Sequence, residues 1–182
     1  MKKESTVAYV LRLTVTLLLI TAIVAALLSV VNGITKPIID RLTLEKTQKA
    51  IEAVLPGGGE EVEFTDNTGL VQTVYKGEKG YAVQVAPAGF NGAITLMVGI
   101  DLEGKILGIS VISQAETAGL GAVCADKTSK GEAFRNQFIG MSGQVAVTND
   151  GGEVDAISSA TITSRAITVG INAALTCVAN MG

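Results

Sequence analysis

The feature that most constrains this chain is an uncharged, apolar stretch of 23 residues, from Leu13 to Thr35. A helix of this length spans about 35 Å, which is enough to cross a hydrocarbon layer of about 30 Å. We expect Lys36-Pro37 to end it. The basic residues before it are Lys2, Lys3 and Arg12. We interpret the stretch as a membrane anchor. The alternative, a cleaved signal peptide, is disfavoured because the run is long and no clear small-residue cleavage site follows.

The charges on the two sides of this stretch bear on its orientation. Basic residues are nearly balanced across it, so the positive-inside rule alone does not decide which end faces the cytoplasm. The basic residues on the carboxyl side are Lys36, Arg41, Lys46 and Lys49. The usual arrangement keeps a short basic amino tail inside. We therefore expect residues 1–12 to be a cytoplasmic tail, 13–35 a single transmembrane helix in the inner or plasma membrane, and the remaining domain to be extracytoplasmic.

The residue inventory excludes many kinds of site. The chain has no His and only two Cys among 182 residues. Without His, a Ser-His-Asp or Cys-His site, a haem His ligand, a non-haem iron triad and the usual zinc sites are excluded. Two Cys cannot hold an iron–sulfur cluster alone. We expect no catalytic acid or base and no metal site on this chain, so any redox chemistry has to come from a cofactor.

The charge balance also limits the partners. The net charge is −3, and removing Lys2, Lys3, Arg12 and Glu4 leaves 11 basic and 16 acidic residues in 36–182, a net charge of −5. Such a domain has no basic surface for nucleic acid. Its 147 residues can bury one core.

The pattern of the remaining chain predicts an α+β domain. Residues 36–59 are expected to be the connecting segment, an amphipathic helix from Ile38 to Leu55 that Pro56 and three glycines end, and residues 60–182 the domain itself. Predicted strands are Val71–Lys76, Tyr81–Ala86, Ala93–Ile100, Lys105–Ser113, Val145–Thr148 and Val154–Ile157. Predicted helices are Glu132–Ile139 and Ser164–Ala179. Short turns between the strands favour a largely antiparallel sheet with flanking helices.

A cluster of hydroxyl side chains precedes the last predicted helix. Its members are Ser158, Ser159, Thr161, Thr163 and Ser164. At a helix amino end, free N–H groups and the helix dipole favour an anion such as a phosphate. The alternative is ordinary helix capping, for which Ser and Thr are preferred.

A second motif follows a predicted strand. It reads Glu116-Thr117-Ala118-Gly119-Leu120-Gly121. Gly119 and Gly121 allow positive φ and the close approach of a flat ligand, although they are equally consistent with a turn. Glu116 is either a ligand-contacting carboxylate or a solvated loop residue.

Taken together, these motifs resemble the FMN-binding domain of the G subunit of the Rnf electron-transport complex and, similarly, the C subunit of the sodium-translocating NADH:quinone reductase. The D-x-x-S-G-A-T pattern of that family appears here as Asp155-x-x-Ser158-Ser159-Ala160-Thr161. The resemblance implies that a flavin transferase attaches FMN through its phosphate to Thr161, as a phosphoester. The family usually has Gly at position 159, Pro at position 118 and often His at position 114, where this chain has Ser, Ala and Gln.

Further segments carry the resemblance along most of the chain. They are Gly89-Phe90-Asn91-Gly92, Val98–Asp101, Gly104–Gly108 and Phe134–Phe138. The resemblance implies a cofactor-binding set of Asp155, Ser158, Ser159, Ala160, Thr161, Thr163, Glu116, Thr117, Gly119, Leu120 and Gly121. We expect the isoalloxazine ring near the 116–121 loop, with Leu120 over one face.

The function implied by the resemblance is electron relay through covalent FMN, in a membrane complex that couples ferredoxin and NAD to ion transport. The alternatives are the quinone reductase subunit, with the same cofactor and other partners, and a non-redox scaffold or pilin-like protein. The implied partners are the other subunits of the complex and the flavin transferase. For Cys124 and Cys177, a disulfide is permitted, but a buried thiol is favoured for Cys177.

Overall fold

The computed structural model describes residues 6–181, which divide into two compact units between Leu44 and Glu45. Helix α1 (Thr6–Val54) begins in the first unit and ends in the second. The expected stop at Lys36-Pro37 is wrong, because Pro37 lies inside α1. Proline has no N–H, so the carbonyl of Gly33 loses its usual helical donor, an interruption that helices in membranes tolerate. Residues 1–5 of the expected cytoplasmic tail lie outside the described part.

The carboxyl end of α1 agrees with the expectation to within one residue. The helix ends at Val54, where Leu55 was expected, because Pro56 and two glycines with positive φ follow it (Gly57, 103°; Gly58, 70°). The second compact unit begins at Glu45, so the last turns of α1 belong to the domain that was expected to start at residue 60.

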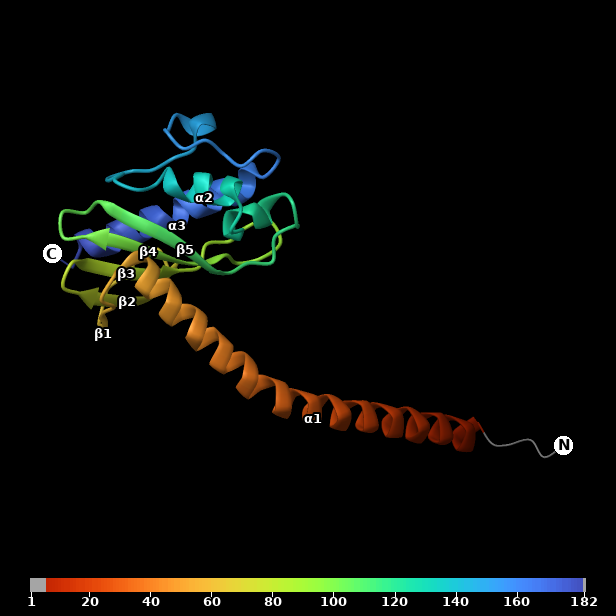
Figure 1. The fold of residues 1–182 in the computed structure, drawn as a ribbon. Helices are drawn as coiled ribbons and strands as arrows, with labels where there is room; N and C mark the ends of the chain where they lie inside the picture. Colours follow the sequence, from red (N-terminus) through yellow and green to blue (C-terminus); the bar gives the residue numbers. More distant parts are fainter. Residues whose placement is uncertain (1–5, 182) are drawn as a thin grey trace. The chain divides into compact units, whose positions relative to one another are not determined.

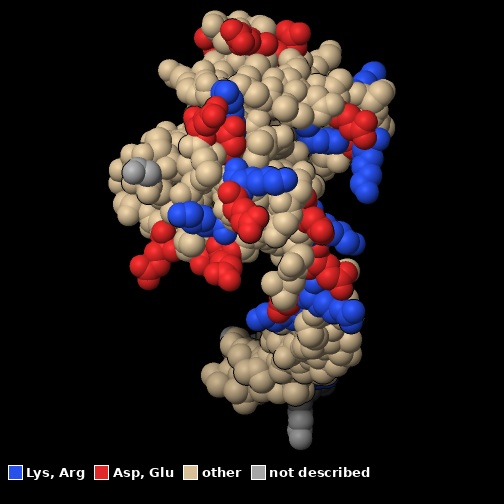
Figure 2. All heavy atoms as spheres, turned by 60° about the vertical axis from the view of Figure 1, so that its left-hand side comes forward, with Lys and Arg blue, Asp and Glu red and all other residues tan. Residues whose placement is uncertain are grey.

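The apolar part of α1 has the properties of a membrane span. It is long and apolar enough to cross a bilayer, and Figure 2 shows it as a segment dominated by uncharged side chains. Three of its hydroxyls are satisfied within the helix: those of Thr14, Thr16 and Thr21 donate to the carbonyls four residues earlier, at 3.0, 2.8 and 3.0 Å. Such internal pairing removes the cost of placing a hydroxyl in lipid. Helix α3 (Thr161–Ala179) also passes the length test, but it is mostly buried in the domain core.

A five-stranded antiparallel sheet forms the centre of the domain (Figure 1). Its strands are β1 (Glu60–Val62), β2 (Val71–Gly77), β3 (Gly80–Val85), β4 (Thr95–Asp101) and β5 (Ile106–Ser113), each paired with its neighbour in sequence. The four strands predicted between residues 71 and 113 are confirmed to within two residues. The β4–β5 turn is held by the Asp101 carboxylate, which accepts the N–H groups of Glu103 and Lys105, both at 2.8 Å.

Helices cover both faces of this sheet. Because side chains alternate along a strand, Val83 and Leu96 face one side while Ala82 and Met97 face the other. The first side packs against α3 in the main core, and the second packs against the last turns of α1. Helix α2 (Ser129–Asn136) adds Phe134 to the main core. This arrangement confirms the expected α+β class.

The segment between α2 and α3 departs from the expectation. The strands predicted at 145–148 and 154–157 are wrong: the structure has a single parallel bridge, between Val147 and Val154, and a short 3-10 helix η2 (Thr148–Asp150). The backbones of the segments that contain Ala146 and Gly152 approach each other closely, since a Cβ on Gly152 would overlap the Ala146 carbonyl oxygen. Both α2 and α3 begin three residues earlier than predicted, which places Thr161 in the first turn of α3.

Candidate functional site

The two motifs meet at one cavity of about 380 Å³, between the loop after β5 and the start of α3. This volume lies within the usual range for small-molecule sites, about 300–1,000 Å³. The residues that line it are Phe90, Glu116, Thr117, Leu120, Gly121, Ser159, Ala160, Thr161, Ile162 and Thr163. The fold therefore brings most of the predicted site residues together, although the motifs are some 40 residues apart in sequence.

Glu116 holds the walls of this cavity together. Its side chain is buried, and its Oε1 accepts the N–H groups of Phe90 (2.8 Å) and Asn91 (3.0 Å). Its Oε2 accepts the Thr163 hydroxyl at 2.6 Å. Hydrogen bonds to a charged acceptor in a buried setting are strong. The carboxylate therefore joins the β3–β4 connection, the loop after β5 and the start of α3, and is not a solvated loop residue.

Two glycines let the chain approach this carboxylate closely. A Cβ on Gly121 would lie 2.5 Å from both Glu116 Oε2 and Thr163 Oγ1, and one on Gly89 would lie 2.5 Å from Glu116 Oε1. Real Cβ atoms do not come this near to neighbouring oxygens. Gly121 is needed for packing, whereas Gly119 meets no neighbour and supplies a positive φ of 75°.

The first turn of α3 presents a hydroxyl and free backbone donors. The N-cap residue is Ala160, and no side chain caps the helix. Within residues 6–181, the N–H groups of Thr161, Ile162 and Thr163 have no backbone acceptor, as expected for the first turn of a helix. The partly exposed Thr161 lines the cavity. Ordinary capping therefore does not account for the hydroxyl cluster, and the arrangement suits a phosphate.

Asp155, Ser158 and Gly119 lie apart from this cavity. They line a second hollow of about 550 Å³, with Lys130 and Phe134 among its walls. The Asp155 backbone is held by the Gln137 side chain, whose Oε1 accepts its N–H at 2.7 Å and whose Nε2 donates to its carbonyl at 3.2 Å.

Sequence reasoning missed three residues here, Phe90, Ile162 and Gln137. Phe90 lies in the Gly89-Phe90-Asn91-Gly92 segment that carries the resemblance, but nothing in the sequence showed that its side chain is exposed at the cavity. Gln137 lies in the Phe134–Phe138 segment that carries the resemblance, but nothing there predicts its contact with Asp155, which joins separate segments.

Ser159 adopts an unusual backbone conformation. Its φ is +61°, the one positive φ among the non-glycine residues that the structure describes. A side chain in the left-handed region costs roughly 1 kcal/mol or more. This conformation explains why glycine suits the position.

We expect Ser159→Gly to raise the free energy of unfolding by about 0.5–1 kcal/mol, the relief of strain outweighing the added freedom of the unfolded chain. Ser158→Gly is the matched control, since Ser158 has no positive φ, and should lower stability slightly. Urea unfolding of the chain in detergent measures both. Equal effects of the two substitutions would contradict the assignment of strain to Ser159.

The segments that form this cavity are similar to known proteins. Residues 89–176 match the family model of the FMN-binding domain. The chain is 32% identical over 176 residues to the G subunit of the ion-translocating oxidoreductase complex of Methanosarcina acetivorans, a match that covers 88% of this chain and 90% of the relative. It belongs to this G-subunit family. A further family member, the G subunit of the Na(+)-translocating ferredoxin:NAD(+) oxidoreductase complex of Acetobacterium woodii, is 29% identical over 198 residues, 94% of this chain and 93% of the relative.

The matched FMN-binding domain contains the whole cavity. Its boundaries at 89 and 176 enclose Phe90, the 116–121 loop and the start of α3. The residues present fit an FMN molecule: free N–H donors and a hydroxyl for the phosphate, and apolar side chains for a flat ring. In this member of the G-subunit family, FMN binding thus has a physical basis in the cavity.

The two cysteines are buried free thiols in this structure. Burial and the nearby Glu116 charge raise the pKa of Cys124 to about 11, and burial raises that of Cys177. The thiolate is the reactive form. We therefore expect neither cysteine to be alkylated by iodoacetamide at pH 8 in the folded protein, and both to react in urea, as counted by intact mass. Rapid labelling of Cys124 in the folded chain would contradict this.

Proposed function

We propose that this protein is an FMN-carrying electron-transfer subunit of a membrane-bound, ion-translocating ferredoxin:NAD oxidoreductase complex. The observation that carries the proposal is the cavity at the start of α3, in which the Thr161 hydroxyl, unpaired N–H groups and apolar side chains converge. Membership of the G-subunit family supports the same conclusion, and so does the relative from Acetobacterium woodii, whose name includes this reaction.

We further propose that FMN is bound covalently, through a phosphoester between its phosphorus and Thr161 Oγ1. A flavin transferase forms this bond from a flavin nucleotide: the hydroxyl loses its proton, and the phosphorus loses its previous substituent. Thr161 is suited to this role because it is partly exposed at the cavity. Thr163 is not, because its hydroxyl is buried and donates to Glu116 at 2.6 Å.

The chain's own residues bind and position the cofactor. The N–H groups of the first turn of α3 receive phosphate oxygens, and Glu116 fixes the loop and the helix relative to each other. FMN supplies the capacity to accept and donate electrons, which the side chains of this chain lack. The ion path belongs to other subunits, because the apolar part of α1 carries no charge that could bind an ion. We assign the electron donor and acceptor to other subunits as well.

The anchor and its orientation complete the proposal. Residues 13–35 of α1 span the inner or plasma membrane, with residues 1–12 in the cytoplasm and the FMN domain on the extracytoplasmic side. A covalent link suits this location, since lost FMN could not readily be replaced there. Protease added to intact spheroplasts should then digest the domain. A domain that is protected from the protease would show that it faces the cytoplasm and that the proposed orientation is wrong.

Intact mass with peptide mapping tests the proposed cofactor. Chain produced together with a flavin transferase should be yellow and heavier than the bare chain by roughly 440 Da, the mass of FMN less water, and the added mass should map to the peptide that contains Thr161. Chain produced without the transferase is the control. An unmodified, colourless product in both preparations would favour a non-redox scaffold.

A further inference from the structure

Three exposed apolar side chains gather at the cavity. Phe90 is 65% exposed, Ile162 52% and Leu120 41%, and all three line the cavity beside Thr161. They come from three separate segments: the β3–β4 connection, the loop after β5 and the first turn of α3. Large apolar side chains that converge around a hollow mark a surface that a ligand covers.

Phe90 is the most exposed of the three, yet its backbone is fixed. Its N–H and that of Asn91 both donate to Glu116 Oε1, and the same carboxylate accepts the hydroxyl of Thr163, two residues after Thr161. The Asn91 side chain adds a bond to Thr117 Oγ1 at 3.2 Å. The backbone from which the aromatic ring projects is therefore fixed relative to the start of α3 by one buried group.

The described contacts of Phe90 within the protein do not require an aromatic residue at this position. The side chain is excluded from the core clusters, and its turn is maintained by backbone donors that any residue would supply. Exposing a Phe side chain to water is unfavourable in free energy, and stacking on a flat ring removes its apolar surface from water.

We propose that Phe90 stacks on the isoalloxazine ring of the FMN held at Thr161, that Leu120 and Ile162 complete the apolar wall, and that Glu116 is the positioning residue that holds Phe90 in place. The inference rests on the proposed function and goes beyond it by naming the residue that contacts one face of the isoalloxazine ring. It makes Phe90 a cofactor-contacting residue, separate from the phosphate acceptor.

The test uses flavin emission as a contact probe in the full chain, loaded by the transferase. Indole and phenol rings quench flavin fluorescence at contact distance, whereas a phenyl ring does so weakly. Phe90→Trp should therefore lower the emission per absorbing flavin several-fold, and Phe90→Tyr should lower it in the same direction. Phe90→Ala should free the ring and lower its fluorescence anisotropy.

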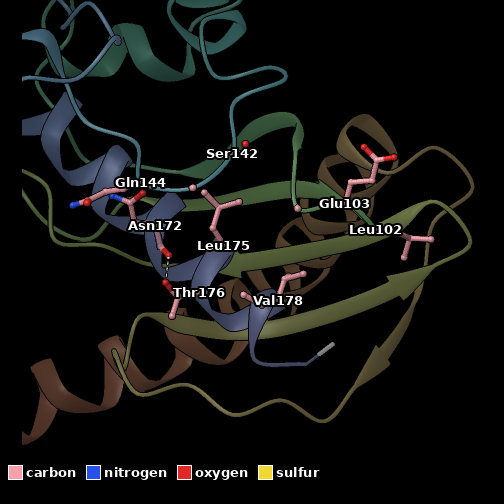
Figure 3. A pocket seen from close by; sticks show the side chains of 11 residues that line it. Leu102, Glu103, Ser142, Gln144, Asn172, Leu175, Thr176 and Val178 are labelled. Carbon is pink, nitrogen blue, oxygen red and sulfur yellow. Dashed lines mark hydrogen bonds between the residues drawn. The ribbon is translucent and has the colours of Figure 1, made fainter.

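Leu102→Trp is the matched control. Leu102 is 67% exposed, similar to Phe90, but it lies in the β4–β5 turn. There it lines a different cavity of about 690 Å³, together with Asn172 and Leu175 of α3 (Figure 3). Its indole should leave the emission of the loaded chain unchanged.

The outcomes separate the inference from the proposed function. A loaded chain whose emission is the same in Phe90→Trp, Phe90→Tyr and Leu102→Trp would overturn the stacking while leaving FMN at Thr161 intact. A wild-type chain that acquires no FMN mass would overturn both. If the indole hinders loading, Phe90→Tyr, which adds only a hydroxyl, decides the matter by the same measurement.

Discussion

Thr161→Ala should abolish covalent flavin. The variant should give no fluorescent band on a denaturing gel and should have the mass calculated for its own unmodified chain. The reason is chemical, because alanine has no oxygen to form the phosphoester. The fold should persist, since the Thr161 hydroxyl makes no hydrogen bond to another described residue and the side chain is partly exposed. Urea unfolding in detergent should show a change within about 0.5 kcal/mol.

Two matched variants make this result decisive. Thr161→Ser keeps a hydroxyl at the same place and should retain fluorescence. Thr163→Ser keeps the bond to Glu116 and should be labelled like wild type. If Thr161→Ala remained fluorescent, the acceptor assignment would be wrong, and peptide mapping of the labelled variant would identify the residue that carries the flavin.

Glu116→Ala should produce the largest loss of stability among single substitutions at the site. The carboxylate accepts two backbone N–H groups and one hydroxyl, and its removal leaves these donors without partners in a largely buried place. Each hydrogen bond to a charged group contributes about 1.5–3 kcal/mol, and bonds to one shared acceptor are not additive, so we expect the free energy of unfolding to fall by roughly 3–5 kcal/mol. Urea unfolding of the full chain in detergent measures this.

An exposed carboxylate provides the control. Glu103 pairs with Lys105 at 2.9 Å on the surface, and Glu103→Ala should change stability by less than about 1 kcal/mol. Thr163→Val removes one of the three donors to Glu116 and should cost about 1–3 kcal/mol. If Glu116→Ala lowered the free energy of unfolding no more than Glu103→Ala, the buried carboxylate would not join the three segments.

Most of the sheet could be predicted from sequence, because its signals are local. Alternating apolar residues and a turn such as Asp101–Gly104 specify the strands on either side, and the structure has them within two residues. The two cofactor motifs were also recognisable, since both are short runs of unusual composition. That they line one cavity could be expected only through the family resemblance, because the pairing of Glu116 with Thr163 spans 47 residues.

The errors arose where distant contacts outweigh local preference. Val145–Thr148 looked like a strand, but Asn172 of α3 accepts the Val145 N–H and donates to its carbonyl, both at 2.8 Å, so a side chain takes the place of a neighbouring strand. Pro37 looked like a helix end, but α1 continues through it to Val54. Phe90 was overlooked as a site residue because exposure cannot be seen in sequence.

The pairing of each strand with its sequence neighbour has a consequence for the order of events during synthesis. All five strands precede residue 114, whereas α3 begins at Thr161, near the end of the chain. Neighbour pairings close only short loops and form early, so a growing chain can hold a paired sheet whose Val83 and Leu96 face is still bare. Thr161, the proposed acceptor, is synthesised together with the helix that covers this face. On the proposed assignment, FMN is attached only after the chain has passed the stage at which a bare sheet face favours aggregation.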